Sequence, residues 1–160
     1  VADLNPSLGL RLDMSIEWNA SSRYRALVAD DSVLVREMLK DLLNKAGFDV
    51  TAVQNGREAW ELLSQIKDKS EAEHQPLSNF VHCMVADIEM PAMDGYTLTT
   101  EIRRHPGLAG LYVLLHTSLS GVFNNAMVER VGANAFVAKY SPHELADFVL
   151  DRLRKVAMAA

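Results

Sequence analysis

Short apolar runs alternate with amphipathic stretches along most of this 160-residue chain, and this alternation strongly constrains its fold. The runs are too short for helices and contain few polar residues, which is typical of strands buried on both faces of a parallel sheet. We expect five strands, at Ala26–Ala29, Phe48–Val53, Val81–Ala86, Leu111–Leu115 and Ala135–Ala138.

The stretches between these runs repeat apolar residues every three to four positions, as helices with one buried side do. We expect helices at Val33–Ala46, around the apolar stripe Ala59–Ile66, and at Tyr96–Arg104, Gly121–Val131 and Pro142–Val156. Asn55 with Glu58 forms a capping box, and Asp94 is placed to cap the helix at Tyr96. Five strand–helix units predict an α/β protein whose parallel sheet is covered on both faces, with right-handed crossovers.

Two segments do not follow this alternation. Residues 1–23 have no clean period, and we interpret them as a linker or N-terminal arm before a domain at 24–157 and a tail at 158–160. Lys67–Asn79 is polar and charged, and it is longer than the usual connection of about 2–6 residues. We expect this second segment to be a solvated insertion.

Composition argues against several classes of function. Sixteen Lys and Arg residues stand against 21 Asp and Glu residues, and the net charge of −5 argues against a nucleic-acid-binding surface. No apolar run approaches the roughly 20 residues needed to span a bilayer, so we expect no membrane insertion. Cys83 is the only cysteine, which excludes an intrachain disulfide and suits a cytoplasmic location.

Charged or hydroxyl residues follow four of the five predicted strands. Asp30 and Asp31 follow the first strand, Asp87 the third, Thr117 the fourth and Lys139 the fifth. In open parallel sheets ligands bind beyond the carboxyl ends of the strands, so we expect these side chains to converge on one edge.

Three converging carboxylates require a cation or a proton. Two carboxylates about 4 Å apart repel by roughly 4 kcal/mol at an effective dielectric constant near 20. Oxygen ligands with room for water suit Mg²⁺, which normally completes its shell with water and a phosphate. Lys139 would supply a positive charge for a phosphoryl oxygen, Thr117 a hydroxyl donor and Asp87 a nucleophile. The sequence therefore predicts Mg²⁺-dependent phosphoryl chemistry at Asp87.

The order of these motifs resembles the receiver domain of response regulators, from about Tyr24 to Lys155. The most specific stretch is Asp87-Ile-Glu-Met-Pro-Ala-Met-Asp-Gly95. The resemblance implies a flavodoxin-like (βα)5 fold, a doubly wound five-stranded parallel sheet of strand order 2-1-3-4-5 in three layers.

The resemblance also implies roles for individual residues. Asp87 would accept a phosphoryl group from a histidine kinase, as a phosphoacceptor rather than an enzyme. Asp30, Asp31, Asp87 and the main-chain carbonyl of Glu89 would hold Mg²⁺. Thr117 and Lys139 would bind the phosphoryl group, and Phe136 would be the switch aromatic.

A closer resemblance is to the receivers of CheV-type chemotaxis coupling proteins. It is carried by Leu115–Gly121 and Val137–Leu145, and Val1–Pro6 resembles the end of the CheW-like domain that precedes such receivers. This implies a chemotaxis histidine kinase as partner, and chemoreceptors or a coupling protein through the attached CheW-like domain. A role as a phosphate sink is a further possibility.

Two positions depart from the receiver pattern. Tyr140 follows Lys139 where receivers usually have proline, and a cis bond before a non-proline residue costs about 2.5–4 kcal/mol, so we expect a trans bond. Phe136 has no hydroxyl, so its two switch states would differ only in packing.

Other interpretations stay open. The domain would act as a constitutive, unphosphorylated docking module if its affinity for partners did not depend on phosphorylation of Asp87. Glu89 has roughly the spacing of the second acid in phosphohydrolases that use an aspartate nucleophile, although the chain lacks a cap domain. His116 adjoins Thr117 and has the alternative of facing the site, but we interpret it as a structural histidine with a satisfied partner. We interpret Met84, Met90 and Met93 as packing residues.

Overall fold

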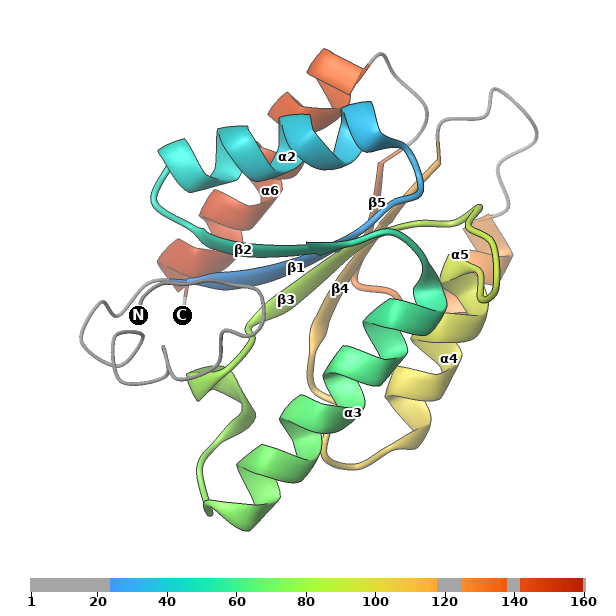
Figure 1. Cartoon of the computed structure of the whole chain (residues 1–160). Helices are drawn as coiled ribbons and strands as arrows, with labels where there is room; N and C mark the ends of the chain where they lie inside the picture. The colour runs from blue at the N-terminus through green and yellow to red at the C-terminus, as the bar shows by residue number, and fades with distance from the viewer. Residues whose placement is uncertain (1–23, 118–124, 138–141, 160) are drawn as a thin grey trace.

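The computed structural model describes residues 24–117, 125–137 and 142–159 (Figure 1). The predicted arm at 1–23, Lys139 and Tyr140 lie outside the described residues, and the domain bounds at 24 and 157 stay predictions. In chain order the elements are β1 (Arg25–Ala29), α2 (Val33–Lys45), β2 (Asp49–Val53), α3 (Gly56–Ala72), the 3₁₀ turn η2 (Leu77–Asn79), β3 (Cys83–Asp87), α4 (Gly95–Arg104), β4 (Tyr112–His116), α5 (Asn125–Val131), β5 (Ala135–Val137) and α6 (Pro142–Ala159).

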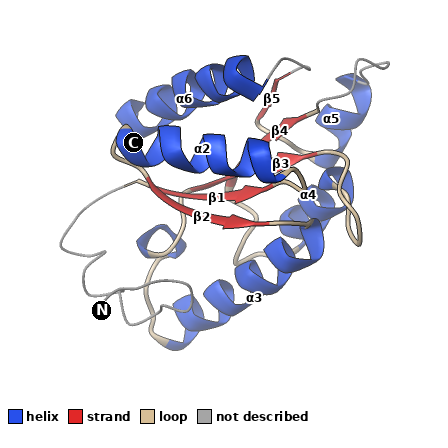
Figure 2. Ribbon diagram, turned by 45° about the horizontal axis from the view of Figure 1, so that its top comes forward, coloured by secondary structure: helices blue, strands red, loops and turns tan. Residues whose placement is uncertain are grey.

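The strands form one parallel sheet of order β2-β1-β3-β4-β5, which confirms the predicted flavodoxin-like fold. Helices α2 and α6 cover one face, and α3, α4 and α5 cover the other, so the molecule has three layers (Figures 1 and 2). Among the described helices, none is both long and apolar enough to span a bilayer.

Strands β1 and β3 are buried along their whole length, as predicted for central parallel strands. Successive side chains of a strand point to opposite faces, and the core divides accordingly. Val28 and Val85 belong to the cluster under α2 and α6, whereas Leu27 and Met84 belong to the cluster under α3 and α4. Met90 and Met93 also pack in this second cluster, which confirms that the three methionines are packing residues.

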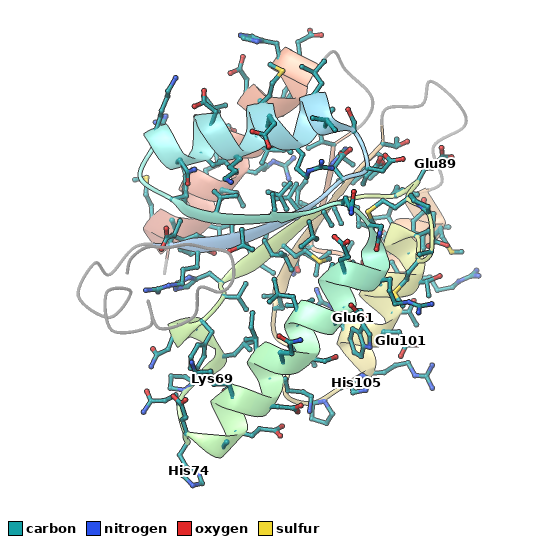
Figure 3. All side chains as sticks on the ribbon, in the orientation of Figure 1. Glu61, Lys69, His74, Glu89, Glu101 and His105 are labelled. Atoms are coloured by element: carbon teal, nitrogen blue, oxygen red, sulfur yellow. The ribbon has the colours of Figure 1, made fainter. Side chains whose placement is uncertain are left out.

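Helix α3 begins at the predicted cap, where the Asn55 Oδ1 accepts a hydrogen bond from the Glu58 N–H at 2.8 Å. The helix continues past Ile66 to Ala72, so the predicted start of the insertion at Lys67 was wrong, whereas residues 71–76 are exposed to solvent as expected. Ion pairs one turn apart, Lys67 with Glu71 at 3.8 Å and Lys69 with Glu73 at 3.9 Å, accompany the last turns. The chain turns back at His74, which Figure 3 labels beyond the end of the helix.

The register of the strands brings their carboxyl ends to one level. Ala29 pairs with Ala86, Asp87 pairs with His116, and His116 pairs with Val137. Asp30 directly follows Ala29, so Asp30, Asp87 and His116 lie in one row across the sheet. These residues continue the alternation of Val28, Val85 and Leu114, which places their side chains on the α2/α6 face.

Candidate functional site

The predicted acid cluster is present at the carboxyl edge of the sheet. Asp30, Asp31 and Asp87 each offer a carboxylate oxygen, and these oxygens all lie within 4.8 Å of one another. Asp30 is 1% exposed and Asp87 is 5% exposed, whereas Asp31 is open to solvent. Within the described ranges, this is the only group of three or more side chains that could hold a metal ion.

The loop between β1 and α2 fixes the position of Asp30. The Ser32 N–H donates to Asp30 Oδ1 at 2.8 Å, and Arg36 Nη1 donates to the Asp30 main-chain carbonyl at 2.7 Å. Ser32 also caps α2, since its Oγ accepts from the Val35 N–H at 3.2 Å. One short segment therefore ends the strand, starts the helix and orients the buried acid.

The loop after β3 holds Asp87 in a comparable way. The Glu89 N–H donates to Asp87 Oδ1 at 3.2 Å, and the Gly95 N–H donates to the Ile88 carbonyl at 2.8 Å. Asp94 caps α4 as predicted, because its Oδ1 accepts from the Thr97 N–H at 2.7 Å. The loop is thus clamped to the start of α4.

Burial raises the pKa of Asp87 to about 6. The nearby charges of Asp30 and Asp31 also raise this pKa, while His116 and the hydrogen bond from the Glu89 N–H lower it. Among the described residues, burial and the two neighbouring acids outweigh His116 and the Glu89 N–H, so the charged form of Asp87 is disfavoured and a bound cation would favour it.

His116 completes the row, and the expectation of a satisfied structural histidine was wrong. Its Nε2 lies 3.2 Å from Asp30 Oδ2, and both side chains are almost completely buried. The two atoms are close but poorly aligned, and among the described residues neither they nor His116 Nδ1 makes a hydrogen bond of good geometry. The sequence signal was a polar residue at the end of an otherwise apolar strand.

The remaining predicted residues lie in several environments. Thr117 directly follows β4, is half-buried, and donates its N–H to the Val137 carbonyl at 3.4 Å. Phe136 is half-buried and packs against the cluster under α3 and α4. Glu89 is exposed on the loop after β3, as Figure 3 shows. Lys139 lies outside the described residues.

The residues at this edge fit a hard divalent cation. Three carboxylates supply oxygen ligands, the pKa of Asp87 is raised, and the buried Asp30 Oδ2 has no well-aligned hydrogen-bond donor in the described part of the chain. A small cation of the Mg²⁺ type satisfies all of these groups and keeps sites for water or phosphate oxygens.

Several known proteins are similar to this chain in sequence. The chain is 27% identical over 131 residues to the chemotaxis protein CheV3 of Helicobacter pylori, covering 82% of this chain and 41% of that protein. It is 30% identical over 159 residues to the two-component response regulator ORR4 of Oryza sativa subsp. indica, covering 89% and 66%. The chain therefore spans less than two thirds of the length of either relative.

A solved structure, the signal receiver domain of a signal transduction histidine kinase from Syntrophus aciditrophicus, superposes with a TM-score of 0.62 at 30% identity. The match covers 81% of this chain and 89% of that one. The family model described as the response regulator receiver domain matches residues 26–149. This chain thus belongs to the response regulator receiver domain family.

Proposed function

We propose that this receiver domain accepts a phosphoryl group on Asp87 from a histidine kinase, in a reaction that depends on Mg²⁺. The observation that carries the proposal is the cluster of Asp30, Asp31 and Asp87, whose oxygens lie within 4.8 Å of one another. Asp30 and Asp87 are buried, and Asp30 Oδ2 has no hydrogen bond of good geometry among the described residues.

The chemistry follows from the placement of Asp87. One carboxylate oxygen of Asp87 attacks the phosphorus of a phosphohistidine, an O–P bond forms, and the P–N bond breaks. The imidazole leaves with the electron pair of the P–N bond and takes a proton from water, so it is released as the neutral base. When bound, Mg²⁺ neutralises charge on the carboxylates and on the phosphoryl oxygens.

Other residues of the chain position the reactants. Asp30 and Asp31 hold the cation, with Asp87 and the Glu89 main-chain carbonyl as further ligands. Thr117 and Lys139 bind the phosphoryl oxygens. Movement of Thr117 toward the phosphoryl group would allow Phe136 to pack inward. This would change which conformations of the surface formed by α5 and β5 are populated.

We further propose that the domain acts in chemotaxis as part of a CheV-type coupling protein. The 27% identity to CheV3 and the stretches Leu115–Gly121 and Val137–Leu145 support this role. Its partners would be a chemotaxis histidine kinase and, through a CheW-like domain, chemoreceptors or a coupling protein. Phosphorylation would modulate that coupling or drain phosphoryl groups from the kinase.

Mass spectrometry after incubation with Mg²⁺ and acetyl phosphate tests the first proposal. We expect wild type to gain one phosphoryl group and Asp87→Asn to gain none. Asp68→Asn is the matched control, because Asp68 lies near the far end of α3, outside the acid cluster. Equal labelling of wild type and Asp87→Asn would refute the assignment of Asp87.

Phosphotransfer from purified kinases tests the chemotaxis role. We expect transfer from an autophosphorylated chemotaxis kinase to be at least tenfold faster than transfer from an unrelated histidine kinase. Equal rates from both donors would remove the support for a chemotaxis role and leave the phosphoacceptor proposal intact.

A further inference from the structure

His116 is a polar residue in a position that folding alone does not explain. The rest of β4 is Tyr-Val-Leu-Leu, and His116 is 1% exposed at the end of that strand. A leucine or methionine would fill the same space without polar atoms. Burying an imidazole without hydrogen bonds costs stability, because its polar atoms lose their contacts with water.

The geometry identifies the polar group that faces this imidazole. Its Nε2 lies 3.2 Å from Asp30 Oδ2, and the side chains are 1% and 2% exposed. An ionised carboxylate can only accept hydrogen bonds, so the Nε2 atom must carry a proton if the two are to interact favourably. Within the described chain, neither atom has another hydrogen-bond partner.

The other polar atoms of Asp30 are already engaged. Oδ1 accepts from the Ser32 N–H at 2.8 Å, and the main-chain carbonyl accepts from Arg36 at 2.7 Å. These contacts hold one carboxylate oxygen and the backbone in place, but the carboxylate group can still rotate. A donor at Oδ2 removes that freedom.

We infer that His116 is a positioning residue for the metal site, and that its Nε2–H orients the Asp30 carboxylate toward the cation shared with Asp31 and Asp87. This inference rests on the proposed Mg²⁺-dependent function. Removing a donor that hydrogen-bonds a ligating side chain without touching the metal commonly weakens metal affinity by about 10–100-fold.

A role for His116 as a direct metal ligand is less consistent with the geometry. The group of side chains whose ligand atoms lie within 4.8 Å of one another consists of Asp30, Asp31 and Asp87, and it does not include His116. His116 reaches Asp30 Oδ2 from β4, across β3, and a contact with one oxygen of one ligand is what a residue that orients a ligand makes.

Mg²⁺ titration calorimetry of a matched pair of variants tests the inference. His116→Gln keeps an N–H donor near the position of Nε2, and His116→Met has nearly the same size without a donor. We expect the dissociation constant for Mg²⁺ to rise at least tenfold in His116→Met and to stay within threefold of wild type in His116→Gln.

The control is His82→Met, which changes a half-buried histidine at the opposite edge of the same sheet, where its Nδ1 accepts from the Arg25 N–H at 2.8 Å. We expect its Mg²⁺ affinity to match wild type. Thermal unfolding establishes that each variant is folded. If His116→Met does not fold, His116→Leu takes its place with the same expected loss.

Two results would overturn the inference in distinguishable ways. If the variants without a donor bind Mg²⁺ as tightly as wild type while Asp87 is still phosphorylated, the role of His116 is refuted and the proposed function stands. If wild type itself does not bind Mg²⁺, both the inference and the proposed metal dependence fail.

Discussion

Asp87 combines two properties that oppose each other: its carboxylate must be charged to act as the proposed nucleophile, and its side chain is almost completely shielded from solvent. Its side chain and that of Asp30 are both buried, and burial raises the pKa of Asp87 to about 6. A carboxylate that is costly to ionise in the folded chain destabilises that chain when no cation is bound.

Replacing Asp87 with asparagine is therefore expected to stabilise the metal-free protein. The folded-state pKa lies above the unfolded value, so the folded state holds this proton more tightly, and stability falls as the pH rises from about 4 to about 6. Asparagine has no such charge. In EDTA at pH 7.5 we expect Asp87→Asn to gain about 1–2 kcal/mol, allowing for partial solvent screening.

Urea unfolding at several pH values measures this gain. The difference between Asp87→Asn and wild type should shrink toward zero as the pH falls to about 4, where both side chains are neutral. Asp68→Asn should show no comparable pH-dependent difference. Equal stability of wild type and Asp87→Asn at pH 7.5 would show that burial of the charge has no energetic consequence.

The start of α4 constrains the acid site through close backbone contact. A Cβ atom added at Gly95 would lie 2.5 Å from the Asp87 carbonyl oxygen and 2.9 Å from Ile88 Cα. Real Cβ atoms do not approach backbone atoms so closely, so the loop carrying Asp87 would have to move. The glycine is needed here for space.

Gly95→Ala is expected to destabilise the fold by about 1–3 kcal/mol and to weaken Mg²⁺ binding, because the displaced loop carries Asp87. Thermal unfolding and Mg²⁺ titration measure the two effects. Gly110→Ala is the matched control, since a Cβ there meets nothing within 4 Å. Unchanged metal affinity in Gly95→Ala would mean that the loop tolerates the shift.

Arg103 joins three elements at the opposite end of α4. Its Nε donates to the Gly132 carbonyl at 2.8 Å, Nη1 to the Leu111 carbonyl at 2.7 Å, and Nη2 to Asn134 Oδ1 at 2.7 Å. Nη1 also donates to the Ala109 carbonyl at 3.1 Å, so the planar guanidinium serves four acceptors at once and ties α4 to the start of β4 and to the turn before β5.

Arg103→Met keeps the apolar stem and removes these donors, and we expect it to lower the free energy of unfolding by about 2 kcal/mol. Arg103→Lys should recover little of this stability, since an ammonium group cannot donate to the same acceptors with the planar geometry of a guanidinium. The exposed neighbour Arg104 provides the control, with a change within about 0.5 kcal/mol for Arg104→Met. Full recovery by lysine would contradict the geometric argument.

Elements were predictable where local chemistry determines them. Asn55 and Asp94 cap α3 and α4 as expected, because a cap depends on residues within one turn. The end of α3 was not predictable from apolar periodicity. Its last turns carry ion pairs such as Lys67 with Glu71, and no apolar stripe marks them.

The acid cluster was predictable for a different reason: parallel strands bring their carboxyl ends together, whatever their sequence. The contact of His116 with Asp30 was not, because it depends on the register of three strands and on the reach of one side chain across β3. Sequence spacing contains no information on that register. Such cross-strand partners have to be read from the folded chain.

For the whole molecule, the proposed cation at this edge would also stabilise the folded state. The three acids lie at the ends of β1 and β3. The helices α2 and α6 pack on one side of these strands, and α3 and α4 pack on the other. The unfolded chain does not hold the three carboxylates together. Binding to the folded state alone therefore raises the free energy of unfolding by RT ln(1 + [Mg²⁺]/Kd), about 2.7 kcal/mol at a hundred times Kd.

We therefore expect Mg²⁺ to raise the unfolding temperature of wild type progressively, and to have little effect on Asp30→Asn, whose amide cannot supply the same charge. Asp87→Asn should be more stable than wild type in EDTA. This difference in stability should disappear as Mg²⁺ approaches saturation, because only wild type gains the full binding energy. Asp68→Asn should follow wild type throughout. If Mg²⁺ shifted the unfolding of wild type and Asp30→Asn equally, the stabilisation would arise outside the acid cluster, and these carboxylates would not be the ligands.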